Sequence, residues 1–531
     1  MNKVILSGVG VLLACADLSA QCPANQRQSA PNVSQVVISS TITCLPIVAN
    51  NGFTPTTTTS SGVIDHALLN VFTYNGPAGP APSSPINTPS NYGVPSTQAA
   101  LTSALSANIA VALSTIPLES PTSGVILKKD EATGALLPVS STLGPIFTKR
   151  AETIGKGKFY FGVTHQSYHF TSYNGQSLNG ISLLYTGNEP TNITFGGALG
   201  ATSPATINLA LDVRISQDVA FITYGATNRL DVSLGLPMVH AAVGATAYNG
   251  AIYSGTGLGN TTGGKCWCAD TFTPGSFNLA VPGIGSSSLG KTGFGDMIVR
   301  VKDAVFERPN AVFAVGTDLR LPTGDAQNYL GTGTTSIKPF AALSLYTKPL
   351  AHGILFAPHA DIGWQYFGRS VLGGALQGTP QAAKLSDGTS VSYLGAPFTS
   401  TKGYLPTIFS WAVGTEVALG PRNTVTADII GNQIGWGHGI QTLVSQQITC
   451  QWTGVNNGAP FACPAPSGAQ AMTSAFAAST TRSSFGQYQG AFGYKARLFG
   501  DLVATFQALV RFDNNGLTAR VVPLYGLGYS F

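Results

Sequence analysis

One pattern repeats along most of this chain: apolar and polar residues alternate one by one through long segments. In residues 209–219, leucine, valine and isoleucine recur at odd positions, with Asp212, Arg214 and Ser216 between them. A period of two is that of a β-strand with one apolar face. The same pattern recurs in residues 158–170, 230–236, 297–305, 311–321, 354–367, 411–419, 423–431, 494–498, 502–512 and 521–531. Several of these segments reach the length of about 9–11 residues that crosses a bilayer obliquely.

The charge content separates this chain from soluble β-proteins. Only 9% of its residues are charged, against about 25% in ordinary soluble domains. A soluble β-sandwich would tolerate the alternation but not the missing surface charge. Apolar residues placed one in two are what lipid-facing strands require. We therefore predict an all-β protein, a transmembrane antiparallel β-barrel of about 12–14 strands formed by residues 151–531 in a bacterial outer membrane.

The connections between these segments differ in length. Gly/Ser/Thr/Asn-rich stretches at 241–292, 370–402 and 433–483 predict long loops, whereas the connections at 421–422 and 499–500 are tight. Long loops at one end and short turns at the other are typical of outer-membrane barrels. The net charge of +5 is small and not clustered, so we expect a lipid bilayer as partner and no nucleic acid.

The N-terminus has the features of an export signal. Residues 4–13 are apolar after Lys3, and Leu18-Ser19-Ala20 is a suitable cleavage site, so we expect residues 1–20 to be a signal peptide. A lipoprotein signal with lipid on Cys15 is the alternative.

Residues 21–150 are predicted to form a Thr/Ser/Pro-rich periplasmic or plug region. Within it, residues 97–116 carry apolar side chains at helical spacing. This single helix would either plug or cap a pore, or pack against the barrel rim.

The cysteines indicate an oxidising compartment. Cys22 with Cys44, and Cys450 with Cys463, are spaced for local disulfides. Cys266 and Cys268 are separated by one residue, which rarely suits a disulfide, and their role stays open. No histidine or cysteine cluster surrounds them, so we expect no metal and no cofactor.

If the apolar positions face lipid, the other positions line the lumen. An ionised Arg or Lys near the bilayer midplane costs about 2–4 kcal/mol, which favours an inward orientation. These charges would either form a salt-bridged interior that holds the barrel's shape or a constriction that filters solutes. The candidates are Asp212, Arg214, Arg300, Lys302, Asp318, Arg320, His359, Asp361, Glu416, Asp428, Lys495, Arg497 and Arg511.

Aromatic residues gather near the ends of the predicted strands, where they are expected to form interfacial girdles. They are Trp364, Tyr366, Phe367, Trp411, Tyr525, Tyr529 and Phe531. The chain stops on Phe531 at the end of an alternating strand, and we expect the barrel-assembly machinery to recognise that strand.

One motif suggests a different chemistry. Residues 285–292 match the phosphate-loop pattern GxxxxGK[ST]. That chemistry needs a helix after the loop, and Gly293-Phe294-Gly295-Asp296 leads into a predicted strand instead. We therefore expect no nucleotide site.

Several segments resemble the outer-membrane β-barrel family named for the meta-pathway of phenol degradation, itself similar to long-chain fatty-acid transporters of the outer membrane. The resemblance runs from Gly144 to Phe531 and rests on residues 144–147, 150–159, 227–232, 293–296, 321–325 and 330–333. It implies a barrel that admits hydrophobic or aromatic small molecules, and it supplies no site residues.

The sequence thus predicts a non-enzymatic outer-membrane channel for passive uptake of small, hydrophobic or aromatic compounds. One alternative is a structural or surface-exposed barrel whose long loops bind a partner. Another is a barrel lipid hydrolase, since a catalytic triad is spatial and leaves no required spacing.

Overall fold

The computed structural model describes residues 96–116, 143–144, 148–185, 205–254, 286–308, 310–347, 354–384, 390–448 and 473–531. It also describes short strands outside these ranges: β1 (Gln26–Gln28), β2 (Cys44–Pro46), β3 (Leu127–Lys129), β4 (Leu136–Pro138), β11 (Lys265–Cys266), β12 (Cys268–Ala269), β25 (Trp452–Thr453), β26 (Val455–Asn456) and β27 (Ala459–Pro460). The predicted signal peptide lies outside the described residues.

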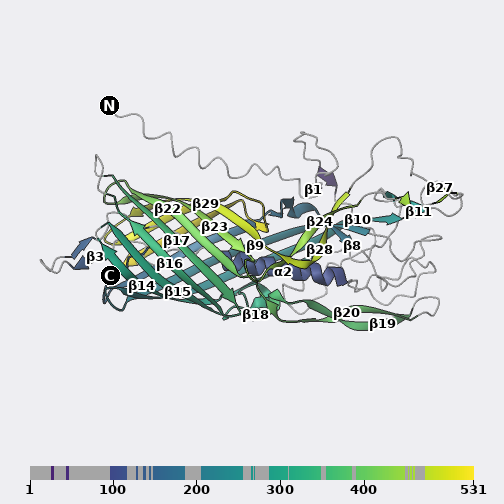
Figure 1. The fold of residues 1–531 in the computed structure, drawn as a ribbon, viewed down its shortest axis with the longest axis horizontal. Helices are drawn as coiled ribbons and strands as arrows, with labels where there is room; N and C mark the ends of the chain where they lie inside the picture. The colour runs from purple at the N-terminus through teal and green to yellow at the C-terminus, as the bar shows by residue number, and fades with distance from the viewer. Residues whose placement is uncertain are drawn as a thin grey trace, which may run out of the picture.

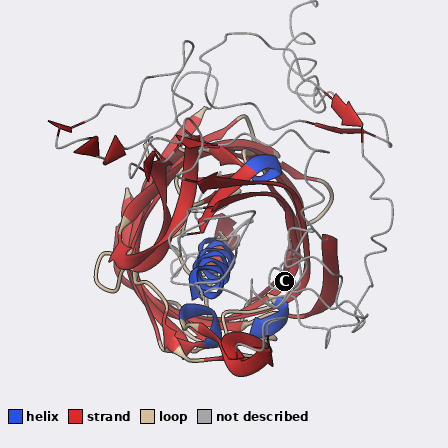
Figure 2. Ribbon diagram, turned by 90° about the vertical axis from the view of Figure 1, so that its right-hand side faces the viewer, coloured by secondary structure: helices blue, strands red, loops and turns tan. Residues whose placement is uncertain are grey.

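Twelve antiparallel strands form a closed barrel (Figures 1 and 2). The last strand pairs with the first, from Leu524 opposite Gln166 to Ser530 opposite Tyr160. Each strand is therefore hydrogen-bonded on both sides and no edge remains, as the membrane interior demands. The prediction of an all-β barrel is confirmed. Its strands are β5 (Phe159–Phe170), β9 (Ala205–Gly225), β10 (Leu230–Ser254), β14 (Met297–Arg308), β15 (Ala311–Leu321), β16 (Ser336–Leu345), β17 (Leu355–Phe367), β22 (Ile408–Ala418), β23 (Asn423–Ile434), β29 (Phe485–Arg497), β30 (Leu502–Arg511) and β32 (Val521–Ser530).

The two ends of the barrel differ. At one end, which we name the short-turn end, the connections are residues 226–229, 309–310, 346–354, 419–422 and 498–501. The opposite, long-loop end carries the longer connections. Because outer-membrane barrels place short turns in the periplasm and longer loops outside the cell, the short-turn end is the periplasmic one. The C-terminus lies at this end (Figure 1).

The connections at the long-loop end contain strands of their own. β9 and β10 continue beyond the ring, where β8 (Ile181–Tyr185) and β13 (Ser286–Phe294) pair with them. β24 (Ile440–Ile448) pairs with β28 (Thr473–Ser483), and β19 (Leu376–Lys384) with β20 (Ser390–Ser400). The stretches expected as loops at 241–292, 370–402 and 433–483 are thus partly strand.

Small elements complete the described part of this end. They are β6 (Ser172–Tyr173), β7 (Gln176–Ser177), β18 (Arg369–Ser370), β21 (Gly403–Tyr404), β31 (Leu517–Thr518) and the 3₁₀ turns η3 (Leu178–Gly180), η4 (Ala326–Asn328) and η6 (Val371–Gly373). The phosphate-loop match falls largely in β13, a strand paired with β10, so the fold does not provide the loop-to-helix junction that such a site needs.

The outer face of the ring is apolar and ends in aromatic side chains. Near the short-turn end, the Phe159 ring lies 4.8 Å from Tyr224 and 5.9 Å from Phe531, measured between centroids. Near the long-loop end, Trp364 lies 5.3 Å from Trp436 in the same way. Two aromatic belts around an apolar band mark the two interfaces of a bilayer.

The protein is therefore located in a bacterial outer membrane. None of the described helices combines the length and the apolar character needed to cross a bilayer. Phe367 departs from the expected girdle: its side chain is buried in the interior core, because it falls on the inward parity of β17.

Arginine at Val413 tests the lipid-facing assignment. Val413 lies midway along β22 with 54% of its surface exposed. Val413→Arg should lower the free energy of unfolding by about 2–4 kcal/mol, the cost of a cation in the hydrocarbon. Ser216→Arg, on the outward face of β9 among polar neighbours, should change it by less than about 0.5 kcal/mol. Denaturant titration in lipid vesicles measures both; equal effects would contradict the assignment.

Candidate functional site in the occupied lumen

A helix occupies the half of the lumen nearer the long-loop end. The predicted helix at 97–116 is confirmed as α2 (Ser96–Thr115); the ring of strands surrounds it in the view along the barrel (Figure 2), and it extends out of the ring at the long-loop end (Figure 1). Its alanines favour helix formation. Every side chain from Thr102 to Val111 is buried. The helix was expected to plug or cap a pore or to pack against the barrel rim, and in the structure it occupies the lumen.

Several polar residues of α2 find hydrogen-bond partners inside the barrel. Ser106 Oγ lies 2.9 Å from the hydroxyl of Tyr329, and Asn108 Nδ2 donates to the hydroxyl of Tyr173 over 3.3 Å. Ser114 Oγ donates to the Ala110 carbonyl at 2.7 Å. The polar side of the helix is therefore buried rather than turned to solvent, and these three side chains have the partners that buried polar groups require, whereas the Thr102 hydroxyl is buried without one.

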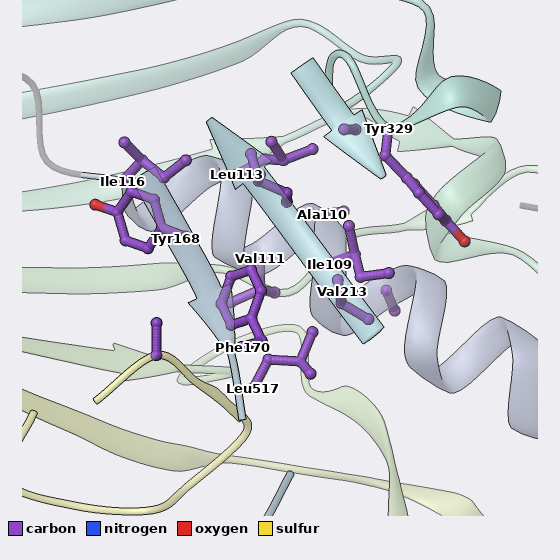
Figure 3. Close-up of a cluster of buried hydrophobic side chains, with 14 of the residues drawn as sticks. Ile109, Ala110, Val111, Leu113, Ile116, Tyr168, Phe170, Val213, Tyr329 and Leu517 are labelled. Atoms are coloured by element: carbon purple, nitrogen blue, oxygen red, sulfur yellow. The ribbon is translucent and has the colours of Figure 1, made fainter. Parts of the chain in front are cut away.

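Apolar side chains of the wall pack around the helix. Tyr168 and Phe170 of β5, Val213 of β9 and Leu517 of β31 belong to this cluster (Figure 3). The largest hydrophobic core of the described residues thus lies inside the lumen. This is unusual, because the interior of an outer-membrane barrel is generally polar.

The expectation that Asp212 and Arg214 line the lumen is wrong. Both side chains are exposed, and they pair with each other on the outer face of β9 at 2.9 Å. Their neighbours Leu211 and Val213 are buried in the core around α2. The alternation of apolar and polar residues along β9 is as predicted, but this part of the strand extends past the bilayer. There the apolar side chains face inward and pack against α2, while the polar side chains face outward into water.

A second segment of the N-terminal region occupies the other half of the lumen. We name it the latch loop, residues 143–157, of which 145–147 lie outside the described residues. Its backbone N–H groups donate to side chains of the barrel wall. The pairs are Leu143 with Thr424 Oγ1 (3.1 Å), Gly144 with Glu416 Oε2 (2.9 Å), Lys149 with Asp361 Oδ2 (2.9 Å), Ala151 with Ser344 Oγ (3.1 Å) and Ile154 with Asp231 Oδ2 (3.1 Å).

The order of these partners traces the path of the latch loop. Thr424 is the second residue of β23, at the short-turn end, whereas Asp361 lies midway along β17. Asp231 is again at the short-turn end, as the second residue of β10. The latch loop therefore rises to the middle of the barrel and returns before β5 begins.

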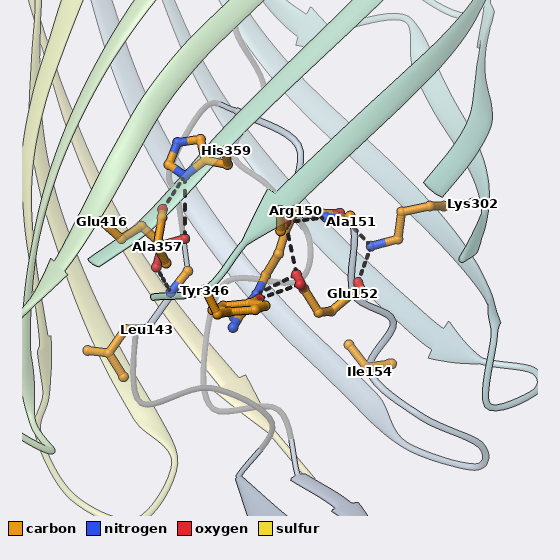
Figure 4. A network of polar contacts seen from close by, with 12 residues as sticks. Leu143, Arg150, Ala151, Glu152, Ile154, Lys302, Tyr346, Ala357, His359 and Glu416 are labelled. Carbon is orange, nitrogen blue, oxygen red and sulfur yellow. Dashed lines mark hydrogen bonds and ion pairs between the residues drawn. The ribbon is translucent and has the colours of Figure 1, made fainter. Parts of the chain in front are cut away.

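A charged pair forms the centre of the latch loop. Arg150 Nε lies 3.2 Å from Glu152 Oε2, and each side chain is only 1% exposed. Ser344 Oγ donates to Glu152 at 3.2 Å, and the Tyr346 hydroxyl donates to it as well (Figure 4). Burial raises the pKa of Tyr346, which keeps this hydroxyl a donor.

Lys302 of β14 holds the same part of the loop through its backbone. Its Nζ donates to the Arg150 carbonyl at 3.0 Å and to the Glu152 carbonyl (Figure 4). It also lies 3.6 Å from Asp231 Oδ2, the carboxylate that accepts from the Ile154 N–H. One buried pair of wall residues thus binds both a carbonyl and an N–H of the loop.

His359 links two of the wall carboxylates. Its Nε2 lies 2.7 Å from Asp428 Oδ1, and its Nδ1 lies 3.7 Å from Glu416 Oε1 and 3.2 Å from the Ala357 carbonyl. Gly414 makes room for this pair, since a Cβ there would stand 1.8 Å from Asp428 Oδ1. Both ring nitrogens are engaged, so His359 is not placed to activate a nucleophile as a hydrolase would need.

The remaining candidates fall into two groups. Four have partners within the lumen: Arg300 pairs with Asp318 at 2.6 Å, Arg320 donates to the Leu113 carbonyl at 3.3 Å, and Lys495 donates to the Leu143 carbonyl at 3.5 Å. Two lie at the rims, where Arg497 pairs with Asp501 in a short turn (2.6 Å) and Arg511 with Asp513 at the long-loop end (3.4 Å).

Strand alternation does not identify the residues of the latch loop that the wall charges bind. Lys149, Arg150 and Glu152 precede the first strand, so strand alternation could not assign them a side. A local signal existed: three charges within four residues of a charge-poor chain. Asp231 is a polar position in the predicted strand at 230–236, but it is not among the lumen-lining candidates predicted from the sequence.

The cysteine predictions stay untested. Cys22, Cys450 and Cys463 lie outside the described residues, while Cys44 lies opposite Gln28 in the β1–β2 pair. Cys266 lies opposite Trp452, and Cys268 opposite Ser254. No group of three or more His, Cys, Asp or Glu that could hold a metal occurs in the described part of the chain.

Comparison with known proteins finds likeness only among solved structures. No family model and no curated protein matches the chain. The COG4313 outer-membrane channel from Pseudomonas putida F1 aligns over 72% of this chain and 98% of its own, with 11% identity and a TM-score of 0.35. A Pseudomonas aeruginosa FadL homologue covers 78% and 98% (10% identity, TM-score 0.27). The TodX monoaromatic hydrocarbon channel, as its deltaS2 mutant, covers 72% and 91% (10%, 0.26).

Membership of the phenol meta-pathway family stays a prediction.

Removing Lys302 should free the latch loop. Lys302→Met leaves the Asp231 carboxylate without its cation and two loop carbonyls without their donor. Breaking a buried ion pair costs about 3–5 kcal/mol. The free energy that protects the backbone amides of residues 149–154 from solvent exchange should fall by about this amount, so these amides should exchange faster. Hydrogen exchange read by mass spectrometry measures this.

Arg214→Met is the matched control. It breaks an exposed pair, worth about 0–1 kcal/mol, and should leave exchange in the latch loop unchanged. Unaltered exchange in Lys302→Met would mean that the wall charges do not hold the loop.

Proposed function

We propose that this protein is a self-plugged outer-membrane channel for small hydrophobic or aromatic molecules. The observation that carries the proposal is the way the latch loop is held. Five of its backbone N–H groups, between residues 143 and 154, donate to wall side chains, and no strand of the barrel is completed by these residues. The loop can therefore leave the lumen without opening the barrel ladder.

The contacts that hold the latch loop are weak enough for the loop to move out of the lumen reversibly. A hydrogen bond to a charged group contributes about 1.5–3 kcal/mol, and the contacts with the wall act on one short segment. Losing a few of them together exposes the segment, whereas opening the barrel would break whole strand pairs. Displacement of the loop is thus the less costly of the two events.

The apolar lumen beyond the latch supports the solute class. Phe170, Val213 and Val239 line the half of the barrel that faces the cell exterior. Transfer of apolar surface from water to such a lining is favourable by about 25 cal/mol per Å². A hydrophobic solute is therefore favoured over a sugar at this level of the lumen, provided that α2 yields part of its contact surface.

A structural or surface-exposed barrel is the second candidate. Its support is the occupancy of the lumen by α2 and the latch loop, both of which form hydrogen bonds to residues of the barrel. A barrel that never opens would show the same contacts. The two candidates differ in flux.

Flux into protein-containing vesicles tests the channel. Benzoate, an aromatic anion that crosses lipid poorly, should enter vesicles with the wild-type protein faster than empty vesicles, and faster still with Lys302→Met. Val213→Asn should lower benzoate entry about fivefold, since about 1 kcal/mol of apolar contact is lost. Arg214→Asn, its outward-facing neighbour, should leave entry unchanged.

A monosaccharide serves as the second solute and should enter more slowly than benzoate with both proteins, because Lys302→Met leaves the apolar lining around α2 unchanged. If neither solute enters faster than into empty vesicles, with the wild type and with Lys302→Met alike, the channel proposal fails and the structural barrel remains.

A further inference from the structure

We propose that the chain preceding α2 lies on the outer surface of the cell, so that the barrel displays its own N-terminal region. This inference concerns the direction in which α2 passes through the lumen. It does not depend on whether the channel conducts.

Three contacts fix the direction of α2. Early in the helix, Ser106 meets Tyr329 and Asn108 meets Tyr173. Both tyrosines belong to connections at the long-loop end, because β15 has ended at Leu321 and β5 at Phe170. Later in the helix, the Leu113 carbonyl accepts from Arg320, the second-last residue of β15, which lies inside the ring of strands and next to its long-loop end. The helix therefore enters at the long-loop end and runs inward.

The packing of α2 agrees with this direction. It contacts β24, β28 and β19, which extend past the ends of the barrel strands. In Figure 3, the cluster has Ile109 nearer Tyr329, and Leu113 and Ile116 towards its opposite end. Figure 1 shows α2 extending out of the ring among the labels of the long-loop end.

The chain after α2 reaches the opposite end of the barrel. Leu143 contacts Thr424 at the start of β23, and the Gly157 N–H donates to the Gly225 carbonyl at the short-turn end. The β3–β4 pair is drawn beyond the short turns in Figure 1. Between the start of α2 and the latch loop, the chain has therefore crossed from one end of the lumen to the other.

With the short turns in the periplasm, the residue that begins α2 lies at the exterior end. The core around α2 fills the lumen beside it, so the preceding chain continues outward. The sequence of residues 21–95 suits that position. It is rich in Ser, Thr, Pro and Asn, and its only charged residues are Arg27 and Asp65.

Surface labelling of a single introduced lysine tests the topology. Residues 21–95 contain no lysine, so Thr58→Lys adds one reactive amine to the segment. Cells producing this variant are treated with a membrane-impermeant amine reagent, either intact or after the outer membrane is permeabilised. Peptide mapping then locates the label.

Two native lysines serve as controls. Lys402 is exposed at the long-loop end and should be labelled in intact cells. Lys156 is exposed at the short-turn end and should be labelled only after permeabilisation. Labelling of Lys402 and a heat-dependent gel mobility show that the variant barrel has assembled, and Ser84→Lys replaces Thr58→Lys if it has not.

The expected result is equal labelling of the introduced lysine in intact and permeabilised cells. Labelling that appears together with Lys156, only after permeabilisation, overturns the proposal. So does detection of the unlabelled peptide under both conditions. Neither outcome alters the flux measurements, so failure here and failure of the channel are distinguishable.

Discussion

The closed hydrogen-bond ladder is the constraint from which the rest of the structure follows. Hydrocarbon offers no partner to a backbone N–H or carbonyl, so every strand in the bilayer must pair on both sides. The ring that results divides the side chains of each strand into two sets. One set must suit lipid, and the other encloses a space that has to be filled or hydrated. The sequence alternation is the record of this division.

The enclosed space is filled in two physically different ways. Towards the cell exterior, α2 and the wall form an apolar core of the kind found in soluble proteins, with polar atoms such as Asn108 Nδ2 paired. Towards the periplasm, charged wall residues bind the backbone of the latch loop. Buried ion pairs add little net stability compared with apolar packing, but leaving one half unpaired is costly. The charges therefore define where the loop sits more than they stabilise the barrel.

Strand alternation predicted the architecture well because the bilayer acts on every strand alike. Most inward charges, including Lys302, His359 and Asp361, were identified by parity alone, and the structure places them in the lumen. The same rule gave the wrong side for Asp212 and Arg214, because β9 has left the bilayer there. At this level water lies outside the barrel and an apolar core lies inside it. Alternation shows that a strand has an apolar and a polar face, but not which of them points outward. In a strand that extends beyond the membrane, the polar face can point outward in the part outside the bilayer.

The partners of the wall charges could not be predicted in this way. Arg150 and Glu152 lie in a segment without regular structure, and their positions depend on contacts with β14 and β16, about 150 to 190 residues away in sequence. No local pattern encodes such a distance.

The number of strands adds a topological consequence. An even number of crossings returns the chain to its starting side, so Phe159 and Phe531 lie together at the short-turn end, where their rings stack. The passage of α2 through the lumen adds one more crossing. The start of this helix and the end of the last strand therefore lie at opposite ends of the barrel. α2 carries no acidic residue in its first turn and no basic residue in its last, and no charge lies between them. Its passage through the lumen consequently needs no compensating ion pairs. Hydrophobic contact, a few neutral hydrogen bonds and the bond from Arg320 to the Leu113 carbonyl hold it there, while other charges of the wall bind the latch loop.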